Sequence, residues 1–461
     1  MLLSLLVAAL VSQAPVANVV ELPNGMRWVL LPRPSEPRVS GLVMVNVGGV
    51  HERQGEAGIA HLLEHLAFSG TPIVGARTEW RLEAPLLDDV LKLTEQLTRV
   101  QLDEGPTSPA AMQLETKLIV AERDWEEQGD SHRFDLLYSL NDVDHNAWTT
   151  WDDTTYWGDF PPEQLHLWLA AEAQRFAAPV FRDFRRERAV VLQESIDRQR
   201  SSTTATSALW QLALGGDRSW VLSGTEAEVR AARPSTVEAF YARLYAPSNA
   251  VGVLVGNFEP AAATRWLHET FALIPSRQVD ASVEVVTGPP ATRTIVGRER
   301  RVLIGFAAPP SRHPESPAFE LAEQVLWLDR GVVGRACAAC THVESATGPG
   351  LERAHLLGVS IDLVAAQSST AVVDDFFSKL SSLVVDDEAF ERARAQSEVS
   401  RARTLRTRKG LAQALARSLL FGDDASAVLA PRYRSVTRDE VERVLRGFTR
   451  DRAWVVIQET P

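Results

Sequence analysis

His61-Leu62-Leu63-Glu64-His65 is the stretch of this 461-residue sequence that says most about its fold and its chemistry. On a helix, the two histidines are four residues apart and therefore lie on the same face. Neutral imidazoles in this arrangement can bind one zinc ion from the same side. Glu64 follows His61 by three residues, so its carboxylate lies near that face and can take a proton from an activated water. The pattern therefore predicts a zinc site with its own general base.

A histidine pair at helical spacing can also be an ordinary surface pair, because short motifs occur by accident. The chain has only 10 histidines, which makes an accidental match to the whole pattern rare. The surrounding residues favour a helix, since Ile59, Leu62, Leu63 and Leu66 form an apolar stripe and Gly70 can end the helix. The metal interpretation is therefore favoured.

A catalytic zinc ion needs a third protein ligand and an open position for water. Glu187 and Glu194 are seven residues apart in a segment that is typical of a helix, so both lie on one face. One of them can bind the metal while the other fixes a ligand histidine through a hydrogen bond. The alternative is that both acids pair with arginines on a solvated helix: Arg186, Arg188 and Arg198.

Four segments extend the pattern along the chain: residues 48–52 with 58–71, residues 146–156, Glu187 with Glu194, and residues 245–249 before 251–256. In this order they resemble the pitrilysin/insulinase (inverzincin) family of zinc peptidases, which includes the mitochondrial processing peptidase. The resemblance covers about residues 19–454 and extends to a bacterial branch with a helical insertion. It implies a zinc-dependent endopeptidase that hydrolyses peptides or unfolded polypeptide segments.

The resemblance also implies a role for each site residue. One Zn²⁺ per chain would be bound by His61, His65 and Glu194. Glu64 would be the general base, and Glu187 would hydrogen-bond to a ligand histidine without binding the metal itself. The metal would lower the pKa of its water and polarise the scissile carbonyl.

Substrate binding in this family is by strand addition, which implies that a peptide pairs with an exposed edge near Asn146 and Ala147. We expect Trp148, Trp151 or Trp157 to line the cleft and to favour apolar side chains. Ordinary hairpin packing is the alternative for these tryptophans.

Two departures from the family pattern stand out. The spacing of 129 residues from His65 to Glu194 is several tens longer than usual, and the extra material lies at about residues 81–135. Residues 85–102 and 110–127 are amphipathic at helical spacing, which predicts an inserted helical hairpin. Residues 334–358, where active relatives carry an arginine and a tyrosine that engage the substrate, contain no tyrosine.

In heterodimeric members of the family one subunit carries the zinc motif and the other the arginine–tyrosine pair, so the resemblance implies that this chain is the zinc-bearing half and that a related subunit supplies the pair. Two other classes remain open, namely a non-catalytic structural or assembly subunit and a peptide-binding subunit of the same fold. Retention of both histidines and of Glu64, Glu187 and Glu194 argues against both. The sequence gives neither the natural substrate nor the partner.

The predicted fold class is α+β, a tandem of two related α/β domains that forms half of a clamshell-type metallopeptidase. Residues 18–276 would form the zinc-bearing domain, 277–294 a linker and 295–461 the second domain. The apolar segment at residues 1–17 predicts a signal peptide and export to the periplasm or medium, with a cytoplasmic location as the alternative.

Composition excludes some other functions. The net charge of −12 argues against nucleic-acid binding, because no basic stripe is available to displace phosphate counterions. No segment is long and apolar enough to predict a membrane span. The two cysteines, Cys337 and Cys340, are interpreted as small buried residues, with pairing in an oxidising compartment as the alternative.

Overall fold

The computed structural model describes residues 17–200, 203–215, 220–283, 287–327, 342–349, 352, 355–364, 367–422 and 425–461. Residues 1–16 of the predicted signal peptide lie outside the described residues. So do Cys337, Cys340 and much of the segment 334–358. In the described ranges, no helix combines the length and the apolar character needed to cross a membrane.

The first half of the chain forms a six-stranded sheet in which only the pair β2–β6 is parallel. Its central strands are largely apolar and buried on both faces, whereas the two edge strands are more polar and partly exposed. In spatial order they are β1 (Asn18–Glu21), β2 (Arg27–Pro32), β6 (Ala250–Gly256), β3 (Val39–Val45), β5 (Thr154–Phe160) and β4 (Asp144–Thr149).

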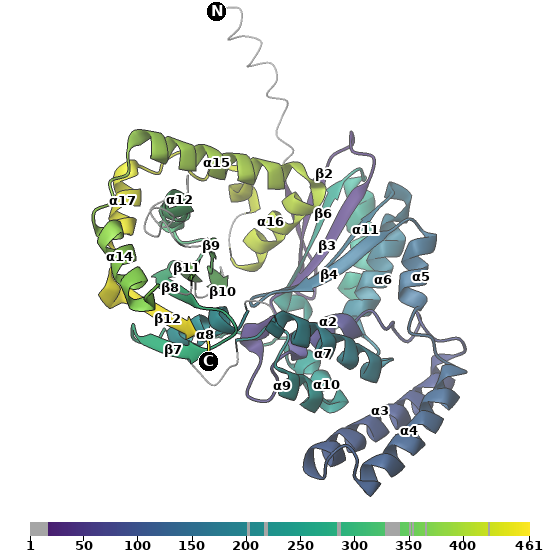
Figure 1. The fold of residues 1–461 in the computed structure, drawn as a ribbon. Helices are drawn as coiled ribbons and strands as arrows, with labels where there is room; N and C mark the ends of the chain where they lie inside the picture. Colours follow the sequence, from purple (N-terminus) through teal and green to yellow (C-terminus); the bar gives the residue numbers. More distant parts are fainter. Residues whose placement is uncertain are drawn as a thin grey trace, which may run out of the picture.

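Helices cover one face of this sheet around a large aromatic core (Figure 1). Trp168 lies on glycines of two strands, because a Cβ atom at Gly41 or Gly158 would come within 2.4 Å of its ring. Small residues in the strands thus create the space that the indole fills. The helices of this half include α2 (Ile59–Leu66), α6 (Leu165–Ala177), α7 (Phe184–Arg200), α9 (Glu226–Ala231), α10 (Pro234–Leu244) and α11 (Pro260–Glu269).

The second sheet repeats the pairing pattern of the first. Here β7 and β12 are the parallel pair, and β8 and β11 continue antiparallel, as β3 and β5 do in the first sheet. This correspondence confirms the predicted tandem of two related α/β units. The strands are β7 (Thr292–Val296), β8 (Arg301–Ala308), β9 (His342–Ser345), β10 (Gly348–Pro349), β11 (His355–Asp362) and β12 (Ala453–Glu459).

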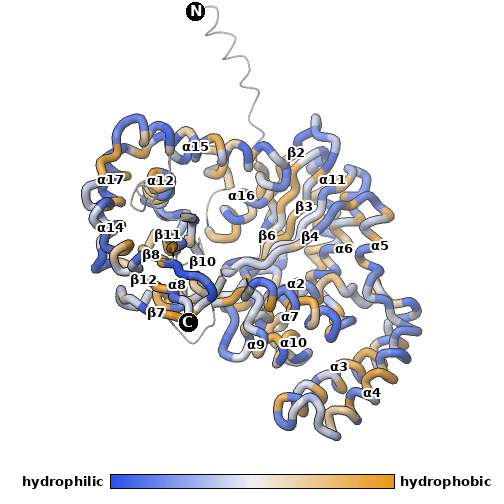
Figure 2. Tube along the Cα trace, in the orientation of Figure 1, coloured by the Kyte–Doolittle hydropathy of each residue, from blue (hydrophilic) through white to orange (hydrophobic). Residues whose placement is uncertain are grey.

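The two units exchange a helix. From the second unit, α16 (Arg408–Leu420) packs on β3 and β6 of the first sheet, and from the first unit, α8 (Thr203–Leu214) packs on β8 and β12 of the second. Figure 2 shows apolar residues on both partners where α16 meets β6. The remaining helices among the described residues of the second unit are α12 (Ser316–Trp327), α14 (Ser369–Ser381), α15 (Asp387–Arg406) and α17 (Arg438–Arg446).

Ion pairs between the two units surround the exchanged helix α16. Arg408 lies 3.0 Å from Asp159 and 2.7 Å from Glu36, and Arg417 lies 2.5 Å from Asp153. Asp153 is fully buried, so its charge is compensated inside the interface. The linker predicted at residues 277–294 ends inside β7, which begins at Thr292.

The insertion contains helices α3 (Trp80–Asp103) and α4 (Pro109–Glu126), which project from the first unit as a hairpin (Figure 1) and precede α5 (Arg133–Leu140). The helix predicted to begin at residue 85 begins five residues earlier, and Pro85 lies inside it. The early start has a tertiary cause, because Glu83 in the first turns of α3 is fully buried and bound to Arg182.

Short 3₁₀ helices complete the described elements: η1 (Gly49–His51), η2 (Pro162–Gln164), η3 (Pro247–Asn249), η4 (Phe271–Leu273), η6 (Ala425–Leu429) and η7 (Arg450–Arg452).

Candidate metal centre and active site

The helix that carries both histidines, α2, is fixed at its first turn by two residues outside it. Gly58 has a φ of 84°, and a Cβ atom there would lie 2.7 Å from the carbonyl oxygen of Ser223. Only glycine fits this left-handed, crowded position. The carboxylate of Glu52 accepts a hydrogen bond from the Ala60 amide (2.9 Å) and so caps the helix.

Three candidate ligand groups converge where α2 meets α7. His61, His65 and Glu194 each offer one ligand atom, and these atoms all lie within 4.8 Å of one another. Nε2 of His61 is 3.5 Å from Oε2 of Glu194, and Nε2 of His65 is 3.9 Å from Oε1. Two imidazoles and one carboxylate are the ligand set of many catalytic zinc sites.

His61 has the properties of a metal ligand. Only 6% of it is exposed, and its buried Nδ1 has no hydrogen-bond partner in the described part of the chain. Burial lowers its pKa to about 3, and the positive charges of His65 and Arg198 act in the same direction. Since a ligand imidazole must be neutral, this environment fits a metal ion.

His65 is held by the second acid of α7. Its Nδ1 lies 3.2 Å from Oε2 of Glu187. Burial acts to lower the pKa of His65, but the hydrogen bond to Glu187 and the negative charges of Glu64 and Glu194 outweigh it, so the pKa is raised. A carboxylate behind a ligand histidine fixes the orientation of the ring and increases its basicity.

Glu64 is buried beside the two histidines and accepts a hydrogen bond from Thr149 Oγ1 to its Oε2 (2.6 Å). Burial raises the pKa of Glu64, although the bond from Thr149 and the charge of His65 act against the rise. A raised pKa suits a carboxylate that takes up and later releases a proton. Sequence reasoning gave Thr149 and Glu52 no individual role, although both lie in quoted motifs.

The three arginines that were the alternative partners of Glu187 and Glu194 differ in the residues that they contact. Arg198 lies 3.0 Å from Glu194, so this acid has both a cation and the histidines as neighbours. Arg186 contacts His132, and Arg188 donates to Thr98 and to the Ala232 carbonyl. Neither is among the described hydrogen-bond or ion-pair partners of Glu187.

A cavity of about 610 Å³ opens over these groups. It is bounded by β4, which lies at the edge of the first sheet and contributes Asn146, Ala147 and Trp148. Trp148 thus lines the cleft as expected. Trp151 instead packs between Trp210 and Trp220, and Trp157 lies beneath the ammonium group of Lys409, so these two are packing residues.

Two family models match the sequence. Residues 27–78, which include both histidines, match "Insulinase (Peptidase family M16)", and residues 233–397 match "Peptidase M16 inactive domain". The chain is related to the M16 peptidases. The Arabidopsis thaliana "Zinc protease PQQL-like" is 25% identical over 252 residues, which are 52% of this chain and 21% of that protein. The Escherichia coli "Probable zinc protease PqqL" is 22% identical over 281 residues, or 59% of this chain and 25% of the relative.

Solved structures share the fold of this M16 relative along almost its whole length. A protease from Helicobacter pylori superposes with a TM-score of 0.75 at 15% identity, covering 96% of this chain and 100% of the other. The periplasmic protease PqqL from E. coli gives a TM-score of 0.67 at 14% identity, covering 96% of this chain and 48% of that one. The chain therefore spans about half of PqqL, and its fold is that of one clamshell half.

Proposed function

We propose that this chain is a zinc-dependent endopeptidase whose metal is held by His61, His65 and Glu194. The observation that carries the proposal is the convergence of these three ligand groups within 4.8 Å beside the buried carboxylate of Glu64. The zinc-protease names of the M16 relatives support the same conclusion. When bound, the zinc ion supplies a Lewis acid that polarises the scissile carbonyl and acidifies water.

The residues of the chain itself perform the proton transfers. Glu64 takes a proton from the attacking water and delivers it to the leaving nitrogen of the peptide. The Thr149 hydroxyl donates a hydrogen bond to Oε2 of Glu64, so Oε1 is the oxygen that accepts the proton of the water. Glu187 keeps the ring of His65 in its ligand orientation through Nδ1.

The outer edge of β4 would bind the peptide. In the described part of the chain β4 pairs only with β5, so its other edge can pair with an extended segment, which would replace the Asn146 side chain as the partner of the Ala147 amide. Asn146 and Ala147 lie on this strand and line the cavity. Backbone pairing of this kind gives affinity with little sequence preference.

We further propose that the chain is the zinc-bearing subunit of a heterodimer, as in the mitochondrial processing peptidase. Residues 334–358 contain no tyrosine, and PqqL, described as periplasmic, is about twice as long as the matched region. A related subunit would then supply the arginine–tyrosine pair, and the N-terminal segment would direct export.

The test is peptide hydrolysis by the purified, zinc-loaded chain, with and without a chelator, beside the Glu64→Gln variant. Chelator-sensitive cleavage that is absent in the variant would establish the peptidase and exclude the need for a partner. Stoichiometric zinc without cleavage would support the partner proposal. Absence of both zinc and cleavage would favour the second candidate, a non-catalytic subunit, to which the match of residues 233–397 to an "inactive domain" lends weight.

A further inference from the structure

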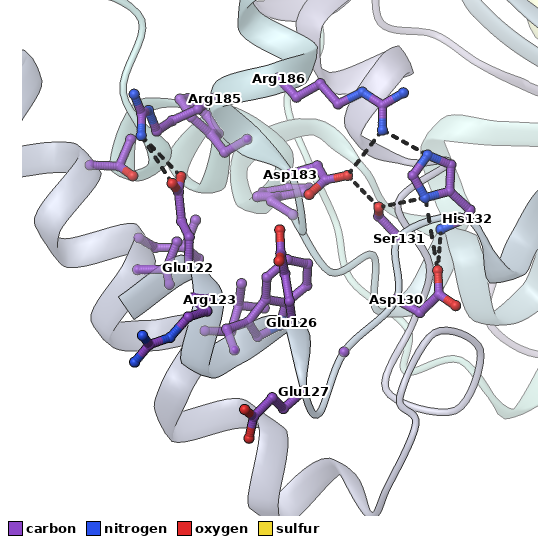
Figure 3. A pocket seen from close by; sticks show the side chains of 18 of the residues that line it. Glu122, Arg123, Glu126, Glu127, Asp130, Ser131, His132, Asp183, Arg185 and Arg186 are labelled. Carbon is purple, nitrogen blue, oxygen red and sulfur yellow. Dashed lines mark hydrogen bonds and ion pairs between the residues drawn. The ribbon is translucent and has the colours of Figure 1, made fainter. Parts of the chain in front are cut away.

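A second and larger cavity, of about 810 Å³, lies between the inserted hairpin and the start of α7 (Figure 3). It is next to the cavity of the candidate metal centre, because the same four residues line both: Ser131, His132, Asp183 and Arg186. The two cavities therefore adjoin at these residues, and a peptide bound in one would reach the other by passing over them.

Hydrogen bonds fix the shared wall. Arg186 Nη1 donates to His132 Nε2 (2.7 Å), and Ser131 Oγ donates to the carboxylate of Asp183, as Figure 3 shows. Ser131 Oγ also lies 3.3 Å from His132 Nδ1. The polar side chains of the wall are therefore hydrogen-bonded to one another. A peptide bound beside them would not have to replace these hydrogen bonds.

Apolar side chains line part of this hairpin cavity, among them Leu87, Val90, Leu91 and Phe184. The lining also includes a threonine with a buried hydroxyl. Thr94 is 1% exposed and lines the cavity, and its buried hydroxyl has no partner among the described residues. An unpartnered buried hydroxyl is costly, and a ligand that hydrogen-bonds to it recovers that cost.

The lining includes two acidic side chains that no described ion pair engages, although Glu127 is near enough to Arg123 for their charges to interact. The four lining arginines each have an acidic neighbour, namely Arg77 with Asp130, Arg123 with Asp124, Arg185 with Glu115 and Glu122, and Arg186 with Asp183. In contrast, Glu126 and Glu127 make no ion pair or hydrogen bond within the described residues. Figure 3 shows Glu126 pointing from α4 toward Asp183.

We propose that the hairpin cavity is a second subsite for the peptide substrate and that it accepts a lysine or arginine side chain distant from the scissile bond. Such side chains have an aliphatic stem, which suits the apolar lining residues, and a cationic head, which suits the carboxylate of Glu126, whereas Glu127 points away from Asp183 in Figure 3. The inference rests on the proposed peptidase function and would give the insertion a role in substrate selection.

The test is direct binding, so that it does not depend on turnover. Fluorescein-labelled peptides in which one lysine or norleucine occupies successive positions are titrated into the full chain carrying Glu64→Gln, and fluorescence anisotropy gives each Kd. We expect lysine at one or two positions to bind about tenfold more tightly than norleucine. The additional change Glu126→Gln with Glu127→Gln should abolish this preference.

Two further variants sharpen the test. Glu104→Gln removes the same charge from an exposed position at the far end of the hairpin and should leave the lysine preference unchanged. Thr94→Val should raise the Tm, because it removes a buried hydroxyl with no described partner, yet it should weaken binding of the lysine peptide several-fold.

Equal Kd values for lysine and norleucine at every position, or a preference that survives the double glutamate variant, would overturn the proposal. Hydrolysis by the unmodified chain is measured separately. If both bound zinc and cleavage are absent while position-dependent lysine binding persists, the peptidase proposal fails and the subsite stands.

Discussion

The ion pair between Glu83 and Arg182 connects the inserted hairpin to the metal centre. Its removal should lower the free energy of unfolding by an amount that the structure allows us to predict. Both side chains are fully buried, and Arg182 binds Glu83 through Nε (2.6 Å) and Nη2 (2.9 Å). Arg182 also donates to the carbonyls of Ser69, Thr71 and Val74, in the turn that follows α2. It precedes α7 by two residues, so it links both metal-bearing helices to the hairpin.

Removing one partner leaves the other charge buried and uncompensated. We therefore expect Arg182→Met to lower the free energy of unfolding by about 3–5 kcal/mol, and Glu83→Leu to have a similar effect. Because an apolar pair can replace a buried ion pair at little cost, the double variant should lose less than the sum of the single variants.

Urea unfolding monitored by circular dichroism and by tryptophan fluorescence measures these changes, with Arg81→Gln as the control. Arg81 pairs with Glu79 at 2.5 Å beside the same helix, but the two side chains are 75% and 67% exposed, so the control should cost less than about 1 kcal/mol. A loss below about 1 kcal/mol for Arg182→Met, or strictly additive single effects, would refute this reasoning.

Three further predictions concern the metal site and the interface between the two units. Glu187→Gln should weaken zinc binding about 10- to 100-fold in a chelator competition, since this residue orients His65; an unchanged zinc Kd would show that the contact has no such role. Gly58→Ala should lower the Tm, because it combines a φ of 84° with a Cβ atom 2.7 Å from the Ser223 carbonyl oxygen, whereas Gly55→Ala, whose Cβ atom would meet nothing within 4 Å, should cost less. Asp159→Asn tests the pH dependence: burial acts to raise the pKa of Asp159, but hydrogen bonds from Ser40, Arg38 and Arg408 lower it below 3.8, so its contribution is present above about pH 4 and is lost at lower pH. The difference in urea midpoint between Asp159→Asn and the unmodified chain should therefore shrink as the pH falls below 4, and a constant difference would contradict the assignment.

The sequence predicted those features that depend on local spacing. Two histidines four residues apart on one helix, and two glutamates seven apart on another, share a face whatever surrounds them, so α2 and α7 could be anticipated. A second strand-then-helix unit after the predicted linker, together with the family resemblance, indicated two related α/β units, and the repeated strand order of the two sheets confirms them.

Features that depend on distant residues could not be predicted in the same way. Nothing near Thr149 indicates that its hydroxyl reaches Glu64, 85 residues earlier. The start of α3 before Pro85 depends on the bond between Glu83 and Arg182, 99 residues apart. The exchange of α8 and α16 between the two sheets has no local signature, because an amphipathic helix does not encode which sheet it covers.

The most direct test of the central claim is the zinc content and zinc affinity of the full chain, measured by mass spectrometry and chelator competition. We predict one zinc ion per chain in the unmodified protein and in Glu64→Gln, because Glu64 is a base and not a ligand. Glu194→Gln should bind zinc at least about tenfold more weakly, since it removes one of three ligands. Equal zinc affinity in all three proteins, or loss of zinc in Glu64→Gln with retention in Glu194→Gln, would contradict the proposed metal centre.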